Sequence, residues 1–302
     1  MTQSFTPQPG NETARPKLTP EEYAQKKQAE REGVYMLVDI AASEITQSPE
    51  HFRIFLDAQS QMDRYSTANA LLIYKQFPRA TQLKEFSDWA AENVRVSKGE
   101  KSILILEPSE YVKRDGSQGI GFQVKNVFDV LQTNSRKRTI QQRLASPREL
   151  VEAMLGASPV SVQMVDGFSN PDREVFYSAQ DQALFLKKDL EPDVAFCQNL
   201  SRELGRAFLP PLAAGGSRQG QDFQAECVGY LFCRKYGIDT RRFAVGQIPE
   251  DWKQLDARAL RGKLSEIRSA FTELHSRTFE NLYRNRQERQ MTQERQGGRE
   301  ER

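Results

Sequence analysis

The feature that most constrains the fold of this chain is a helix that ends at a proline and is followed by two strand-like segments. In residues 66–76, Ala70, Leu71 and Tyr74 recur at spacings of one, three and four, which is typical of a helix with one apolar face. Pro78 ends that helix, because the residue before a proline disfavours the helical conformation. Two strands are then expected over 102–106 and 121–128, joined by a polar turn. This order predicts a helical front that feeds a small antiparallel sheet.

Two motifs mark further helix starts. Thr19-Pro20 precedes two glutamates, and Ser146-Pro147 is followed by Glu149. A hydroxyl before a proline, with acids in the first turn, is typical of a helix N-terminus. Together with apolar spacing, these motifs predict helices over 20–43, 49–62, 86–91 and 147–155.

The second half of the chain predicts a separate α+β unit after a polar, basic stretch at 133–143. Strands are expected over 160–165 and 174–187, with a turn at 179–182, before helices over 194–208 and 223–236. Gly237 is placed to end the last of these. Apolar residues spaced by four and three predict a final amphipathic helix: Leu260, Leu264, Ile267, Phe271 and Leu274. The predicted division is a disordered tail at 1–17, domains at 18–135 and 145–245, an amphipathic helix at 250–290 and a disordered tail at 291–302.

Composition limits the classes of function. The 302 residues include 43 basic and 41 acidic side chains, for a net charge of +2, so any nucleic-acid site must be a local patch. Three cysteines in apolar patterns do not suggest a disulfide framework. No stretch approaches the roughly 20 apolar residues of a membrane span. We expect a cytoplasmic protein with no membrane partner.

The first half also resembles a known family. The block from Tyr65 to Thr81, then Trp89 and the segments 98–108 and 127–133, resembles the N-terminal domain of ArdC-type antirestriction proteins and LtrC-like proteins of mobile elements. The resemblance covers about residues 20–133. It implies binding of single-stranded DNA, with a role in conjugation, in transfer of a mobile element and in protection from restriction.

Single strands are held by cations that contact phosphate and by aromatic faces on which bases stack. Lysines that are exposed in a turn before a strand are best placed to contact DNA phosphates. We therefore favour Lys98 and Lys101 as phosphate contacts. The other residues expected to bind DNA are Lys75, Arg79, Tyr65, Asn69, Lys113 and Arg114. An aromatic at helical spacing is more often core, a lysine is often only solvated, and Asn69 could instead cap backbone groups.

The second half carries Arg202-Glu203-Leu204-Gly205-Arg206, where zinc peptidases have His-Glu-x-x-His. Over residues 145–240 the chain resembles such a peptidase domain, with Glu226 at the position of a third zinc ligand. Zinc needs lone pairs from two imidazoles one turn apart. A guanidinium stays protonated and has none. The resemblance therefore implies a degenerate metal site.

An arginine can replace the charge of a metal. Glu226 is expected among apolar residues, where an unpaired carboxylate is costly, so we predict that Arg202 or Arg206 pairs with Glu226 and Glu203 across the two helices. The alternative is a surface pair of Glu203 with Arg206 on a helix unrelated to peptidases. The cysteines, at positions 197, 227 and 233, are expected in the core.

The sequence thus predicts an α+β protein: a helical front with a small antiparallel sheet, a zincin-like α+β domain and a long C-terminal helix. We expect a protein that binds single-stranded DNA and is not an enzyme, with no catalytic residue, metal or cofactor. Two alternatives remain. One is an interaction module in which the C-terminal helix docks a protein partner, and the other is a metallopeptidase with unusual ligands.

Overall fold

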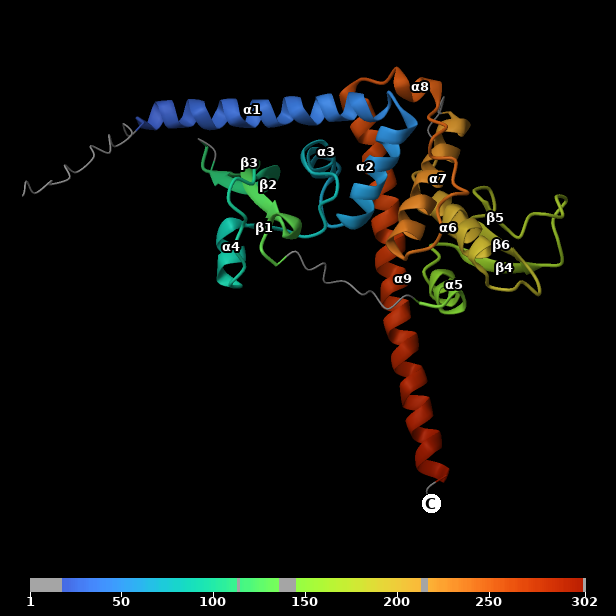
Figure 1. The fold of residues 1–302 in the computed structure, drawn as a ribbon. Helices are drawn as coiled ribbons and strands as arrows, with labels where there is room; N and C mark the ends of the chain where they lie inside the picture. The colour runs from blue at the N-terminus through green and yellow to red at the C-terminus, as the bar shows by residue number, and fades with distance from the viewer. Residues whose placement is uncertain (1–17, 113–114, 136–144, 213–216, 301–302) are drawn as a thin grey trace, which may run out of the picture.

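The computed structural model describes residues 18–112, 115–135, 145–212 and 217–300, with side chains up to residue 291. The fold is α+β (Figure 1). The predicted tail at 1–17, the stretch 136–144, residues 301–302, Lys113 and Arg114 lie outside the described residues. The helices are α1 (Pro20–Ile45), α2 (Pro49–Gln61), α3 (Thr67–Gln76), α4 (Phe86–Ala91), α5 (Pro147–Gly156), α6 (Val194–Phe208), α7 (Arg218–Lys235), α8 (Glu250–Lys253) and α9 (Ala257–Glu300).

The first sheet is antiparallel, with strand order β1-β3-β2. Its strands are β1 (Leu83–Glu85), β2 (Ile103–Val112) and β3 (Gln118–Asp129), so the two predicted strands are longer than expected and β1 was missed. A 3-10 turn, η1 (Val130–Gln132), follows β3. One face of the sheet covers a small hydrophobic cluster formed by Met62, Ile73, Ala80, Ile103, Ile105 and Val127.

Two side-chain amides of α3 pair with the edge of β2. Asn69 donates to the carbonyl of Leu106 and accepts from its N–H, both at 2.8 Å. Gln76 makes the same pair of hydrogen bonds with Leu104, at 3.0 and 2.9 Å. Amides on α3 thus replace a neighbouring strand and satisfy edge groups of β2. The structure does not support Asn69 as a DNA-binding residue, because its buried amide both donates to and accepts from the backbone of β2.

The second sheet has the order β4-β6-β5, with β4 (Ser161–Val165) parallel and β5 (Val175–Ser178) antiparallel to β6 (Ala183–Lys187). The helix α6 packs on β5 and on α7. A positive φ of 71° at Gly237 follows α7, as expected for a glycine that ends a helix. The strand, turn and helix predictions for this half are confirmed, except that α7 begins five residues earlier than predicted.

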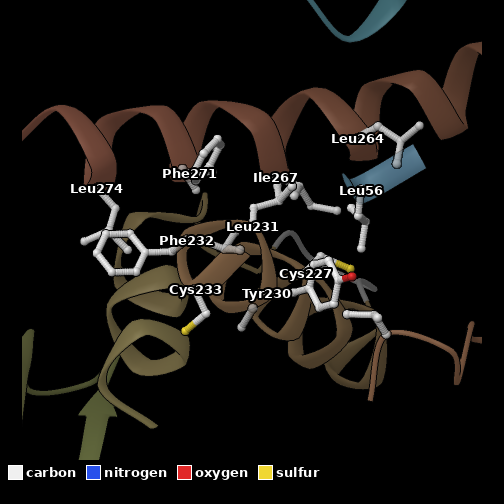
Figure 2. Packing of buried hydrophobic residues seen from close by; sticks show 14 of the residues in the cluster. Leu56, Cys227, Tyr230, Leu231, Phe232, Cys233, Leu264, Ile267, Phe271 and Leu274 are labelled. Atoms are coloured by element: carbon white, nitrogen blue, oxygen red, sulfur yellow. The ribbon is translucent and has the colours of Figure 1, made fainter. Parts of the chain in front are cut away.

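The two halves share one hydrophobic core. Side chains of α1, α2 and α3 belong to the same buried cluster as those of α5, α6, α7 and α9. Figure 2 shows the apolar stripe of α9 pointing at α7, with Leu56 of α2 beside it. The stripe residues Leu264, Ile267 and Phe271 are buried. The stripe is therefore core, and the expectation that it docks a protein partner is wrong.

The C-terminal helix differs from its predicted bounds. The predicted helix over 250–290 is divided into α8 and α9, because Asp256 starts a new helix by accepting from the N–H of Ala259 at 2.7 Å. At its other end α9 continues to Glu300, through part of the predicted tail. Glutamine, glutamate and arginine are good helix formers, so the polar composition read as a tail is compatible with helix. Of the helices within the described ranges, none is long and apolar enough for a membrane span.

A half-buried charge cluster ties α9 and α7 to the end of α2. Asp63 lies 3.2 Å from Lys235 Nζ and 3.4 Å from His275 Nε2, and the Tyr236 hydroxyl is 3.0 Å from His275 Nδ1. Burial opposes ionisation of Asp63, but the hydrogen bond from His275 and the charge of Lys235 outweigh it and lower its pKa from 3.8 to about 2.

Asp63→Asn should lower the free energy of unfolding at neutral pH. A carboxyl whose folded pKa is lowered stabilises the fold above its unfolded pKa and loses that contribution as it protonates. The difference between the variant and the wild type should therefore shrink as pH falls from 3.8 to about 2. Urea unfolding across this range measures it, and a difference that stays constant with pH would show that the Asp63 charge does not stabilise the fold.

Candidate functional sites

The loop that leads into β2 presents three cations. Arg95, Lys98 and Lys101 are exposed, and none of them has an ion-pair partner within the described part of the chain. We call residues 95–101 the basic loop. Its carboxylate, Glu100, is 3.1 Å from the side-chain amide of Gln132. The local balance is three cations to one anion, which makes the basic loop a local positive patch on a nearly neutral protein.

Hydrogen bonds hold the basic loop against the segment after η1. The N–H of Ser97 donates to the carbonyl of Gln132 at 2.8 Å, and that of Asn134 donates to the carbonyl of Arg95 at 2.9 Å. The Gln132 amide also donates to the carbonyl of Lys101 at 2.8 Å. The cations therefore project from a fixed backbone. Arg95 was missed from the sequence, although its position three residues before Lys98 was a usable signal.

The other residues expected to bind DNA are scattered. Lys75 is paired with Glu44 at 2.5 Å, so its charge is already neutralised. Tyr65 is half-buried, and burial raises the pKa of its hydroxyl. Arg79 is exposed and lines a separate hollow of about 560 Å³ with Arg234. The structure therefore keeps Lys98 and Lys101 together and separates them from the rest.

The aromatic residues of the first half include both buried and exposed rings. Tyr74 and Trp89 are buried, and the Trp89 indole donates to the carbonyl of Phe128 at 2.9 Å. Tyr111 and Phe122 are exposed on the β2–β3 hairpin. The exposed groups of the first half thus include the basic loop and these two rings.

A cleft of about 950 Å³ opens between β5, α6 and the start of α7, on the side of the molecule where Figure 1 places the second sheet. All four residues of the predicted degenerate metal site line it. The lining includes Arg173, Phe176, Tyr177, Arg202, Glu203, Arg206, Arg218, Asp222 and Glu226. The structure thus brings the sequence-predicted residues together in one concave site.

Ion pairs join the charged residues of this cleft. Arg202 Nε lies 2.5 Å from Glu226 Oε1, although the N–H is not aligned for a hydrogen bond. Arg206 donates to Glu203 at 2.6 Å and to Asp222 at 3.0 Å. The predicted pairing of Arg202 with Glu226 across the helices is confirmed. The i, i+3 pair of Arg206 with Glu203 is also present, but it is largely buried and not on the surface.

Both carboxylate oxygens of Glu203 accept a hydrogen bond. One carboxylate oxygen accepts from Arg206 and the other accepts from the N–H of Tyr177 on the edge strand β5 at 2.9 Å. Glu226 likewise accepts from the N–H of Ala244 at 3.3 Å. Both carboxylates are held as acceptors, which satisfies them in a partly buried site.

Asp222 and Tyr177 were missed from the sequence. Asp222 lies one helical turn before Glu226 on α7, and this spacing was a signal that both carboxylates share a face. No sequence signal marked Tyr177. Burial lowers the pKa of Arg206, but the charges of Glu203 and Asp222 outweigh it and raise the pKa above its usual value. The guanidinium therefore stays charged.

The residues of the cleft do not fit a metal ion. The positions one turn apart on α6 are Arg202 and Arg206, whose guanidinium groups offer no lone pair. Within the residues that the structure describes, no group of three or more His, Cys, Asp or Glu side chains could hold a metal. The cysteines are buried, and burial raises the pKa of the Cys197 thiol to about 11 and of Cys233 to about 12. Thiols in this state are poor ligands.

Two glycines allow α6 and α7 to approach closely. A Cβ on Gly205 would lie 2.8 Å from Val228, and one on Gly229 would lie 2.6 Å from Phe243 and 3.2 Å from the backbone of Arg202. The close approach at Gly229 brings the Arg202 backbone next to α7. These glycines position the ion pairs of the cleft.

Gly229→Ala should destabilise the protein by about 1 to 3 kcal/mol, because the added methyl overpacks the contact with Phe243 and α6. The matched control is Gly262→Ala on α9, where a Cβ meets nothing within 4 Å. That change should stabilise by up to about 1 kcal/mol, the helix propensity difference. Denaturant unfolding measures the change in the free energy of unfolding for both variants. Equal changes would show that the α6–α7 contact is not tight.

A comparison with known protein families finds a match in the first half of the chain. Residues 42–145 match the family of N-terminal domains of the anti-restriction factor ArdC. These residues include α2, α3, the first sheet and the basic loop. This part of the chain is therefore similar to the ArdC N-terminal domain family, which agrees with the resemblance seen in the sequence.

Two solved structures are also similar. The metal-free structure of the antirestriction protein ArdC from the R388 plasmid is 16% identical, covers 73% of this chain and 85% of its own, and has a TM-score of 0.46. The Mn(II)-bound structure of that protein is 14% identical, covers 71% of this chain and 85% of its own, and has a TM-score of 0.49. No curated protein matches the chain.

Proposed function

We propose that this chain is an antirestriction-like protein that binds single-stranded DNA through its basic loop during transfer of a mobile element. The observation that carries the proposal is the exposed, unpaired set of Arg95, Lys98 and Lys101 on a domain that matches the ArdC N-terminal family. Exposed cations on a fixed backbone contact phosphates and release counterions.

The charge distribution supports this site over others in the same domain. Lys75, Lys84 and Lys125 each pair with glutamate, so phosphate would have to compete with a carboxylate there. At the basic loop, phosphate would not have to compete with a carboxylate for the lysines. The exposed rings of Tyr111 and Phe122 on the hairpin are suited to stacking of bases, which supplies affinity without requiring a sequence.

Lys98→Glu with Lys101→Glu should weaken binding of a labelled single-stranded oligonucleotide by about tenfold or more, and the salt dependence should fall by roughly 0.7 per lost phosphate contact. Arg242→Glu with Arg258→Glu changes net charge equally at two exposed cations of the other half that have no ion-pair partner within the described residues, so it is the matched control. Fluorescence anisotropy over a salt series measures both. Equal weakening by the two variants would overturn the assignment of the basic loop, and no binding at low salt would overturn DNA binding itself.

We also propose that the cleft is a degenerate peptidase site without catalysis, in which guanidinium groups take the place of a metal's charge. Its support is the position of Arg202, Arg206 and Glu226, which stand where the peptidase pattern requires three ligands and are joined by contacts of Arg202 with Glu226 and of Arg206 with Asp222. The fixed hydrogen bonds of Glu203 leave no free general base.

Arg202→His with Arg206→His should create a zinc site, because it places two imidazoles one turn apart facing Glu226. We expect stoichiometric zinc in the double variant and none in the wild type, measured by competition with a chromophoric chelator. Zinc should also raise the variant's resistance to urea. Adding Glu226→Gln should weaken zinc binding. A folded double variant without zinc affinity would contradict a metal-site origin, and stoichiometric zinc in the wild type would contradict the degenerate site.

A further inference from the structure

The guanidinium of Arg202 is only partly used by its own ion pair. It meets Glu226 through Nε, and it makes no hydrogen bond to any residue that the structure describes. Nε is the nitrogen that is shielded from solvent, so the two terminal amines remain available at the wall of the cleft that Arg202 lines. A guanidinium edge with free N–H groups matches a carboxylate in geometry and charge.

The rim of the cleft adds two further cations. Arg173 and Arg218 are exposed and have no ion-pair partner within the described ranges. Arg173 lies over the ring of Phe176, 4.8 Å from its centroid, which fixes its place beside β5. The lining holds four arginines and three carboxylates. Since Arg206 and Arg202 face the carboxylates, the excess positive charge lies on the rim.

An apolar wall also lines the cleft. It consists of Phe176 on β5, beside Arg173, and of residues at the end of α6 and in the segment after it: Ala207, Leu209, Pro210, Pro211 and Leu212. Leu212 is 47% exposed. Glutamine side chains at 180, 182 and 221 supply amide donors and acceptors. An apolar wall with a few polar groups is typical of a site that recognises peptide side chains.

We propose that this cleft binds, without cutting it, a peptide segment in which carboxylates alternate with apolar side chains. The carboxylates pair with Arg173, Arg218 and the free amines of Arg202, and the apolar side chains lie on the wall that ends at Leu212. The inference rests on the proposed absence of peptidase chemistry and is independent of the basic loop. A nucleic-acid backbone would find the same arginines but would leave the apolar wall without apolar side chains to contact, so peptide is favoured.

The test uses the full chain and a short labelled peptide of alternating glutamate and leucine, with the glutamine–leucine peptide as the comparison. We expect saturable binding of the glutamate peptide alone. Arg173→Ala with Arg218→Ala should weaken it about tenfold, as expected for two lost charge contacts. Arg202→Lys, which keeps the charge beside Glu226 but loses the planar fork, should weaken it further. Arg258→Ala, at an exposed arginine on α9 that does not line this cleft, should not change it.

Three results would overturn the proposal. One is equal binding of the glutamine peptide, since carboxylate would then not be recognised. Another is displacement of the peptide by a single-stranded oligonucleotide together with loss of DNA affinity in R173A/R218A, which would make the cleft a phosphate site. The third is cleavage of the peptide seen by mass spectrometry, which would also end the pseudoenzyme proposal. Oligonucleotide binding to the same samples shows separately whether the basic loop binds DNA.

Discussion

Charge pairing between α6 and α7 is the constraint on which the second half of the protein depends. The two helices touch closely at Gly229, and that contact brings the charged side chains of both helices to one cleft. Removing one partner of a partly buried pair leaves the other uncompensated, at a cost of about 3 to 5 kcal/mol where burial is complete. The contacts of Arg202 with Glu226 and of Arg206 with Glu203 and Asp222 therefore have to persist together. With these pairs in place, the side chains of the cleft do not form a set of metal ligands.

The paired helices also support the first half. The stripe on α9 packs on α7 (Figure 2), and side chains of α1 to α3 belong to the same buried cluster. The basic loop is in turn fixed to the segment after β3. The proposed DNA site and the cleft are therefore parts of one packed body, in which each keeps its geometry without needing the other's ligand.

The sequence predicted most helices, the second sheet's strands and the pairing of Arg202 with Glu226, because caps, apolar spacing and the cost of an isolated carboxylate are local signals. It did not predict β1, which is three residues long, or the amide pairing of Asn69 with β2. Nor did it find Asp222 as a partner of Arg206. These features depend on segments that meet only in the folded chain. The apolar stripe of α9 was predicted correctly from its spacing, but only the fold shows that the protein's own core covers it.

The most direct test of the central claim is a double-mutant cycle on stability between Arg202 and Glu226. Arg202→Met, Glu226→Gln and the double variant would be compared with the wild type by urea unfolding. If the ion pair holds α6 to α7, the two changes should be non-additive, with a coupling energy of about 1 to 3 kcal/mol. Additive effects within about 0.5 kcal/mol would mean that the two helices are held by apolar packing alone and would contradict the account.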